Sequence, residues 1–321
     1  MSTKFFHTKN SGVINLKIQA SPKLIMIVFF ILAIVVIVMF ISAKAYDIVS
    51  LPTQRFPPST PTGAFEDVTF PSRGLPYQVH AFYMPGKGDA PALINVHGWR
   101  QSRHSEDTMA RAIDLRALGY NVLSIDLQDN GGDTVEDGRL SMGYKERYDV
   151  LGAFDYLLSR GYAAEKIGLV GVSMGASTSL MAAGLDPRIK AIWEDSGYTR
   201  ADSVLAEQAY ADGIPTFLVP TGMLWGMLTT GDRIWEVAPI DYATSFAANQ
   251  QAVYIVHDEH DTLVFFHNGV DMNAAFQKAG VDVTFWDVPD SDLGHAAAVS
   301  KYHDEYFQRL DGFFRNHLNW P

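Results

Sequence analysis

The hydrophobic positions of this chain form one long run near the N-terminus and then a series of short runs. Residues Leu24 to Ile41 are 18 consecutive apolar residues. At about 1.5 Å per helical residue they nearly cross a hydrocarbon core of roughly 30 Å. A buried core helix rarely continues that far without a polar residue. The run therefore predicts a transmembrane segment, which we place at residues 24–43.

The charges around this run predict its orientation. Four lysines precede it, whereas Lys44 is the one basic residue close behind it; the four are Lys4, Lys9, Lys17 and Lys23. By the positive-inside rule, residues 1–23 are expected in the cytoplasm and the rest of the chain outside, on a single-pass cell-membrane protein. Ala43-Lys44-Ala45 also fits a signal-peptidase site, but cleaved signals usually have apolar regions of only about 7 to 15 residues. An uncleaved anchor is favoured, and both alternatives export the same domain.

Residues 44–62 differ in composition from what precedes and follows them. Pro52, Pro57, Pro58 and Pro61 stand among Ser and Thr, which is typical of an extended, semi-rigid linker. Residues 63–321 are then the exported domain. Because residues 1–60 carry six basic side chains and one acidic one, the remainder has a net charge of -16. Such a charge favours solubility, and we expect the linker to hold the domain away from an anionic lipid surface.

Beyond the linker, short apolar runs alternate with helical patterns. Phe65 to Pro71 and Tyr77 to Met84 predict an antiparallel hairpin. Further strands are predicted at 92–96, 121–127, 167–173, 189–194, 252–256 and 283–288, and helices near 105–117, 144–159, 174–183, 268–279 and 296–317. Apolar strands separated by amphipathic helices are typical of a mostly parallel sheet covered on both faces. The fold class is therefore α/β, a three-layer α/β/α sandwich.

Residues 198–251 interrupt this alternation. They contain no strand pattern but many apolar and aromatic side chains, among them Phe217, Leu224, Trp225 and Leu228. A connection this long inside a domain is usually functional or has helices of its own. We expect an inserted helical cap over the C-terminal edge of the sheet; ordinary helical packing is the alternative.

Composition excludes several classes of protein. The chain has 321 residues, a net charge of -11 and no cysteine. Nucleic-acid affinity rests mostly on cationic side chains, so a nucleic-acid partner is not expected. Without cysteine there are no disulfides, thiolate metal sites or cysteine nucleophile. Any nucleophile must use oxygen or nitrogen.

One predicted strand runs into a candidate nucleophile. Gly171-Val172-Ser173-Met174-Gly175 follows the strand pattern and opens a helical one. A serine on such a sharp turn has strained backbone angles, and only small residues at Gly171 and Gly175 leave room for the neighbouring strand and helix. The helix N-terminus behind Ser173 favours developing negative charge. Ser173 is therefore the predicted nucleophile, and a purely structural glycine turn is the alternative.

A serine needs a histidine to remove its proton and an acid to orient that histidine. Asp261 lies in the polar loop after the predicted strand 252–256, and His295 lies in the loop after strand 283–288. Both loops are at the sheet edge where α/β folds place their sites. We predict Asp261 as the acid and His295 as the base. Asp195 is the alternative acid, and His260 and His267 are the competing bases.

The loop after the first central strand supplies the other expected part of the site. Asn95-Val96-His97-Gly98-Trp99-Arg100 is a turn of the kind that contributes an oxyanion-hole amide. The two predicted donors are the backbone N–H groups of Trp99 and Met174. His97 is expected to shape this turn rather than to catalyse.

Together these motifs resemble the α/β-hydrolase superfamily over about residues 65–319. Two stretches, 143–150 and 173–191, are more narrowly similar to bacterial esterase-like hydrolases related to prolyl-oligopeptidase catalytic domains. The resemblance implies a catalytic triad of Ser173, Asp261 and His295 and hydrolysis of esters, thioesters or amides without a cofactor. The sequence departs from the family at Asp258, where Gly often follows His, and at residues 129–133, which replace an Arg-Gly-His-Gly loop.

The sequence thus predicts a membrane-anchored serine esterase acting on a small or hydrophobic acyl substrate. A peptidase or acyltransferase with the same triad is one alternative, and a catalytically silent binding scaffold is another. A metal-dependent hydrolase using His257, Asp258, His260 and Asp261 is less favoured because these residues lack a defined ligand spacing. No metal is therefore expected, and the sequence does not determine the oligomeric state.

Overall fold

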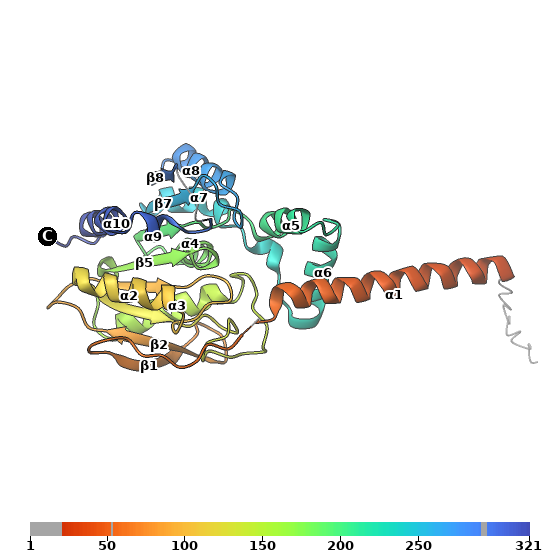
Figure 1. Ribbon diagram of the computed structural model, residues 1–321, viewed down its shortest axis with the longest axis horizontal. Helices are drawn as coiled ribbons and strands as arrows, with labels where there is room; N and C mark the ends of the chain where they lie inside the picture. Colours follow the sequence, from red (N-terminus) through yellow and green to blue (C-terminus); the bar gives the residue numbers. More distant parts are fainter. Residues whose placement is uncertain (1–20, 53, 290–293) are drawn as a thin grey trace, which may run out of the picture. The chain divides into compact units, whose positions relative to one another are not determined.

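Helix α1 (Pro22–Ser50) is the first element in this computed structural model, which describes residues 21–52, 54–289 and 294–321. The chain divides into two units, Met1–Ile41 and Ser42–Pro321, and α1 runs from the first into the second (Figure 1). The predicted cytoplasmic residues 1–20, with Lys4, Lys9 and Lys17, lie outside the described residues.

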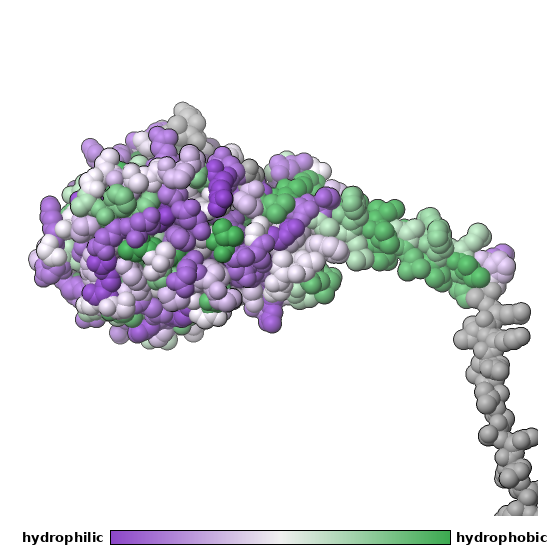
Figure 2. Space-filling view, turned by 90° about the horizontal axis from the view of Figure 1, so that it is seen from below, coloured by the Kyte–Doolittle hydropathy of each residue, from purple (hydrophilic) through white to green (hydrophobic). Residues whose placement is uncertain are grey.

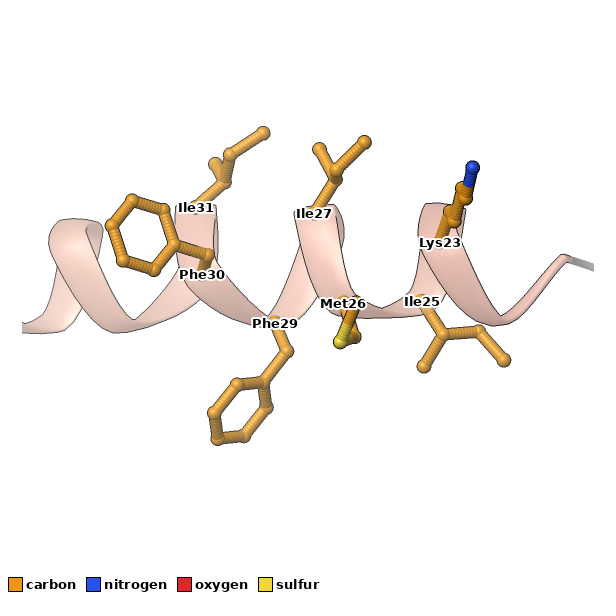
Figure 3. A pocket seen from close by; sticks show the side chains of 7 residues that line it. All are labelled: Lys23, Ile25, Met26, Ile27, Phe29, Phe30 and Ile31. Carbon is orange, nitrogen blue, oxygen red and sulfur yellow. The ribbon is translucent and has the colours of Figure 1, made fainter.

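The apolar part of α1 has the length and composition of a membrane span. Its most apolar 18-residue window has a mean hydropathy of 3.6 and no buried residue. Figure 2 shows this part of the helix as a hydrophobic surface. A shallow hollow of about 820 Å³ lies along it. Figure 3 shows that its lining side chains, from Lys23 to Ile31, all project from this one helix. Because all of its described lining belongs to α1, the hollow is a furrow between side chains of one helix and not a substrate site.

The structure differs from the sequence prediction after residue 43. The predicted extended linker begins as helix, because α1 continues to Ser50, and Ser42, Tyr46 and Ser50 are buried. Residues 54–61 lack regular structure, as expected, but lie against the domain. The backbone N–H of Phe56 donates to the carbonyl of Gly131 at 3.0 Å, and that of Ser59 donates to His104 Nδ1 at 3.1 Å. The described part of this segment is therefore not a free spacer.

Eight strands form one sheet in the order β1-β2-β4-β3-β5-β6-β7-β8. Strands β1 and β2 pair antiparallel, as do β2 and β4, and the remaining pairs are parallel. The strands are β1 (Glu66–Pro71), β2 (Gln78–Met84), β3 (Ala92–Val96), β4 (Asn121–Ile125), β5 (Ile167–Val172), β6 (Ala191–Asp195), β7 (Ala252–Asp258) and β8 (Asp282–Val288). All residues of β3 to β7 are buried, which explains their continuous apolar sequences.

Helices cover both faces of this sheet and confirm the three-layer α/β/α prediction. One core joins the sheet to α3 (Glu146–Ser159), α4 (Met174–Leu185) and α8 (His267–Ala279). A second core joins its other face to α2 (Glu106–Leu118) and α10 (His303–His317). The predicted final helix is divided, because α9 (Ala298–Lys301) ends at Tyr302, whose φ of -118° and ψ of 41° are not helical. A short helix, η1 (Ala164–Lys166), precedes β5.

The helical cap is present where the sequence predicted it. Residues 198–251 contain no strand, and their elements are α5 (Ala201–Ala211), α6 (Leu218–Thr230), η2 (Ile234–Glu236), η3 (Pro239–Tyr242) and α7 (Ala243–Ala248). Figure 1 shows α5 and α6 beyond the end of the sheet, on the side of the domain away from α10. Gln208 of α5 donates to the carbonyl of Leu263 at 2.6 Å. The cap therefore contacts the loop that follows the C-terminal end of β7.

Candidate active site

Ser173 occupies a strained turn between β5 and α4. Its φ of 57° and ψ of -127° lie in a region that residues other than glycine rarely adopt. Its backbone N–H donates to the carbonyl of Asp195 at 2.7 Å, which ties the turn to the neighbouring strand β6. The residue is only 9% exposed. The turn therefore presents a single hydroxyl at the C-terminal edge of the sheet, at the N-terminus of α4.

The two glycines that flank Ser173 leave no space for a side chain. A Cβ on Gly171 would lie 2.5 Å from the carbonyl oxygen of Gly175 and 2.6 Å from the Cα of Ala176. A Cβ on Gly175 would lie 2.3 Å from the carbonyl oxygen of His97. These distances agree with the steric reason inferred from the sequence: the turn brings α4 against β5 on one side and against the end of β3 on the other.

Asp261 and His295 are brought into contact from separate loops. His295 Nδ1 lies 2.6 Å from Asp261 Oδ2. The other carboxylate oxygen of Asp261 accepts the backbone N–H groups of Leu263 and Val264 at 2.8 and 2.9 Å. The carboxylate is therefore held by its own loop and has one oxygen left for the histidine. This arrangement favours the tautomer with its proton on Nδ1 and leaves Nε2 as an acceptor.

His295 Nε2 is buried and has no hydrogen-bond partner among the described residues. No hydrogen bond joins this atom to the Ser173 hydroxyl in this conformation. Such contacts are often long in the absence of substrate and shorten only in the reacting complex. Of the three predicted residues, the structure brings Asp261 and His295 into direct contact and places Ser173 on the turn that follows β5.

The loop that carries His295 is attached to β7 by an acidic residue. Asp258 Oδ2 accepts the backbone N–H of Ala297 at 2.7 Å. Gly294 and Ala296 on either side of His295 both have positive φ, 84° and 53°. Burial raises the pKa of Asp258, opposed by its backbone hydrogen bonds. The sequence analysis treated Asp258 as a departure from the family pattern and as a less favoured metal ligand, and did not predict that it holds the His295 loop. Its position at the C-terminal end of a strand was the available signal.

The turn after β3 lies beside Ser173, as predicted. A Cβ on Gly98 would be 3.2 Å from the Cβ of Ser173. Within the described chain, the backbone N–H groups of Trp99 and Met174 donate no hydrogen bond, so both remain available. His97 accepts the N–H of Leu127 at Nε2 and contacts the carbonyl of Gly98 through Nδ1. Burial lowers the pKa of His97 and favours its neutral form, so this residue shapes the turn.

The end of α1 contacts the same turn, which the sequence analysis did not foresee. Trp99 Nε1 donates to the carbonyl of Val49 at 3.2 Å. Arg100 lies over the Trp99 ring and donates to the carbonyls of Ile48 and Leu51. Arg100 itself has a positive φ of 55°. The last turn of α1 therefore supports the loop that carries the candidate oxyanion donor.

The alternative acid and bases have other partners. Asp195 accepts hydroxyl hydrogens from Ser196 and Tyr306, both at 2.9 Å. His267 lies 2.9 Å from Glu207 of the cap and is half exposed. His260 is exposed. Among the described residues, none of these three side chains makes a hydrogen bond or ion pair with the side chain of Ser173 or His295.

Two buried carboxyls lie next to the site at the end of β6. Burial raises the pKa of Glu194 to about 8 and that of Asp195 to about 6. One oxygen of Glu194 accepts the N–H of Gly197 at 2.6 Å, and the other has no partner within the described part of the chain. These groups are uncharged over part of the neutral pH range and make stability depend on pH.

In the part of the chain that the structure describes, two clusters of side chains have ligand atoms close enough to share a metal ion, and neither includes Ser173, Asp261 or His295. The first is His104, Asp126 and Asp133, and the second is Asp129, Glu136 and Asp137. Cationic side chains already neutralise both: Arg103 lies 2.8 Å from Asp133, and Lys145 lies 2.8 Å from Asp137. The stretch from His257 to Asp261 forms no such cluster among the described residues.

Comparison with solved structures places this architecture among α/β-hydrolases. An esterase from Pyrococcus furiosus superposes with a TM-score of 0.64 and 20% identity over 84% of this chain and 99% of its own. An acylaminoacyl peptidase from Pyrococcus horikoshii gives 0.61 and 17% identity over 79% of this chain and 42% of its own. An α/β-hydrolase from Penicillium gives 0.61 and 15% identity over 80% of this chain and 100% of its own.

Sequence comparison identifies the family. A search of curated proteins found no significant match. The profile of the prolyl oligopeptidase family matches residues 107–320, about two thirds of the chain. This range includes Ser173, Asp261 and His295. The chain therefore belongs to the prolyl oligopeptidase family and is a serine hydrolase of the α/β-hydrolase fold.

Proposed function

We propose that this serine hydrolase cleaves ester bonds through an acyl-enzyme intermediate on Ser173, with His295 as the base and Asp261 as the residue that orients it. The observation that carries the proposal is the 2.6 Å contact between Asp261 and His295 Nδ1, which leaves a buried, unpartnered Nε2. The strained turn that holds Ser173 at the C-terminal end of β5, in the same sheet as β7, supports the assignment. Supporting evidence for the reaction class is the family membership.

The chemistry follows from these positions. Nε2 of His295 takes the proton of the Ser173 hydroxyl as its oxygen attacks the substrate carbonyl. The resulting oxyanion accepts hydrogen bonds from the backbone N–H groups of Trp99 and Met174. His295 then gives its proton to the leaving alcohol as the carbon–oxygen bond breaks, which leaves the acyl group on Ser173. Water, deprotonated by the same Nε2, releases the acid and restores the serine.

The proposal includes the location of the enzyme. The apolar helix α1 fits a single-pass anchor, and the four lysines before it favour a cytoplasmic N-terminus and an extracytoplasmic catalytic domain. The apolar cap favours a small or hydrophobic acyl group over a charged one. A cofactor has no role in this reaction scheme.

Labelling of the active serine tests the mechanism. The full chain in detergent is treated with a fluorophosphonate probe and compared with Ser173→Ala and His295→Ala. Ser159→Ala is the matched control, because Ser159 is exposed at the end of α3 and its hydroxyl bonds only the carbonyl of Tyr156. We expect stoichiometric labelling of the wild type and the control and none of the two site variants. A folded wild type that does not label would contradict the mechanism and favour a binding scaffold.

Peptide hydrolysis is the second candidate activity, because the matching family is named for an oligopeptidase. Ester and amide hydrolysis share the acyl-enzyme and differ in the leaving group. Parallel assays with p-nitrophenyl esters and with peptide p-nitroanilides separate them. A kcat/KM at least 100-fold higher for the esters is the expected outcome, and the reverse order would make the chain a peptidase.

A further inference from the structure

The cap helix α6 has two different faces. Gly222 and Gly226 lie on one face and contact the end of α1: a Cβ on Gly222 would be 3.6 Å from the carbonyl oxygen of Ser42, and one on Gly226 would be 2.6 Å from the ring of Tyr46. Two glycines four residues apart allow two helices to approach closely. Hydrogen bonds reinforce this packing, because the Tyr46 hydroxyl donates to Asp232 at 3.0 Å.

The opposite face of α6 is apolar and exposed. Leu224 and Leu228 are one helical turn apart and are 47% and 68% exposed, and Phe217, seven residues before Leu224, is 64% exposed. At 100° per residue these three positions share one face, turned away from Gly222 and Gly226.

The charge pattern separates this helix from the rest of the domain. No Asp, Glu, Lys or Arg occurs from Gly213 to Gly231, although residues 61–321 carry a net charge of -16. A long uncharged stretch with an exposed apolar face on a strongly acidic domain is costly in water and suits the boundary between headgroups and acyl chains.

The contacts of Gly222 and Gly226 show which part of the chain lies next to α6. The residues against which α6 packs, Ser42 to Tyr46, directly follow Ile41, the last residue of the apolar run. At most five residues of α1 therefore lie between the end of the run and the residues on which α6 packs. If α1 spans a membrane, as proposed above, the partner of α6 is the surface of that same bilayer.

We propose that Phe217, Leu224 and Leu228 insert into the leaflet from which α1 emerges. The catalytic domain then lies on the lipid, in contrast to the separation from the lipid surface that the linker composition and net charge predicted. The proposal rests on α1 being a membrane anchor and goes beyond it, since an anchor alone does not require a second lipid contact. An ester substrate that partitions into the bilayer would then reach the cap without crossing water.

The absence of cysteine allows a direct test. Leu228→Cys in the full chain is labelled with a polarity-sensitive fluorophore and reconstituted into phosphatidylcholine vesicles with and without nitroxide-labelled lipid. Leu185→Cys is the matched control, because Leu185 is a comparably exposed leucine, 42%, at the far end of α4. We expect a blue-shifted emission at position 228 and quenching by nitroxide lipid at least fivefold stronger than at position 185.

Several outcomes would overturn the proposal, and each has a different meaning. Equal, weak quenching at both positions in a chain that floats with the vesicles would leave the anchor intact and place α6 in water. A blue shift at position 228 without nitroxide quenching would assign the face to a second copy of the chain. A chain that does not float with vesicles would overturn the anchor as well. Leu224→Cys repeats the measurement, and cooperative thermal unfolding verifies that each variant is folded.

Discussion

Replacing Asp261 by asparagine changes the chemistry of the site while leaving its shape nearly unchanged. One oxygen of Asp261 accepts two backbone N–H groups, from Leu263 and Val264, and the other faces His295 Nδ1 at 2.6 Å. In Asp261→Asn the amide oxygen must keep the two backbone donors. If the amide were turned around, two hydrogen bonds of about 1 kcal/mol each would be lost. The NH2 group of the asparagine would then face the two backbone N–H groups, and neither side could accept a hydrogen bond.

The asparagine NH2 group therefore faces His295 and donates to Nδ1. The imidazole proton then resides on Nε2, which cannot accept the proton of Ser173. The expected loss of kcat is about 10⁴-fold, equivalent to about 5.5 kcal/mol of transition-state stabilisation, with little change in KM. The rate of fluorophosphonate labelling should fall in parallel, and it does not depend on knowing the natural substrate.

The control for this experiment is Asp258→Asn. Asp258 is also an acid near His295, but its Oδ2 accepts the N–H of Ala297 and its Oδ1 has no partner among the described residues. An asparagine can keep that bond without touching the imidazole. We expect a loss of tenfold or less. If Asp261→Asn kept more than about a tenth of the wild-type labelling rate, the tautomer argument would be wrong.

Three further predictions concern stability. Gly175→Ala should abolish soluble expression or activity, because its Cβ would lie 2.3 Å from the carbonyl of His97, whereas Gly312→Ala, which meets no atom within 4 Å, should be neutral or stabilising in thermal unfolding. The pKa of Glu194 is raised to about 8 in the folded protein. Above the ordinary pKa of a glutamate, the unfolded chain has lost this proton while the folded protein still holds it. The free energy of unfolding should therefore fall as pH rises from about 5 to 8, with this group contributing up to about 1.4 kcal/mol per pH unit. In Glu194→Gln, Tm should fall less steeply with pH. Equal slopes of Tm against pH in the variant and the wild type would contradict this cause. A chain that starts at Pro52 lacks the last turn of α1. It should unfold at a lower temperature than the full chain and react more slowly with the fluorophosphonate probe. Equal Tm values and labelling rates would show that this turn is dispensable.

The order of the elements could be predicted from the sequence because each central strand is apolar on both faces. Strand β3 was predicted at its observed bounds, and β5 to within one residue, since neither has an exposed position that could blur its ends. Long-range contacts were less accessible. Nothing in the local pattern indicates that Arg100 reaches the carbonyls of Ile48 and Leu51, because backbone carbonyls have no sequence signature.

The candidate site shows the same division. Ser173 is the last residue of a predicted strand, and Asp261 and His295 each lie in a loop after one. Chain order and strand–loop boundaries were therefore enough to nominate all three. The support around them was not predictable. The role of Asp258 depends on the backbone of Ala297, 39 residues further along the chain, and the prolines at 52, 57 and 58 suggested an extended linker where α1 in fact continues to Ser50. Composition correctly predicted that residues 54–61 lack regular structure, but it did not predict that α1 continues to Ser50.

The continuation of α1 bears on whether the anchor is removed. The small residues Ala43 and Ala45 fit a signal-peptidase site, and cleavage there would make Tyr46 the N-terminus. Tyr46 is only 3% exposed, its ring packs on Gly226, and its hydroxyl donates to Asp232. Cleavage would place a charged amino group next to the buried ring of Tyr46 and would unwind the helix where it now begins. The last turn of α1, which contacts Trp99 and Arg100, would also lose the helical turns that precede it. The packing therefore favours retention of the proposed anchor, because the helix that would enter the membrane also holds the turn with the proposed oxyanion donor Trp99.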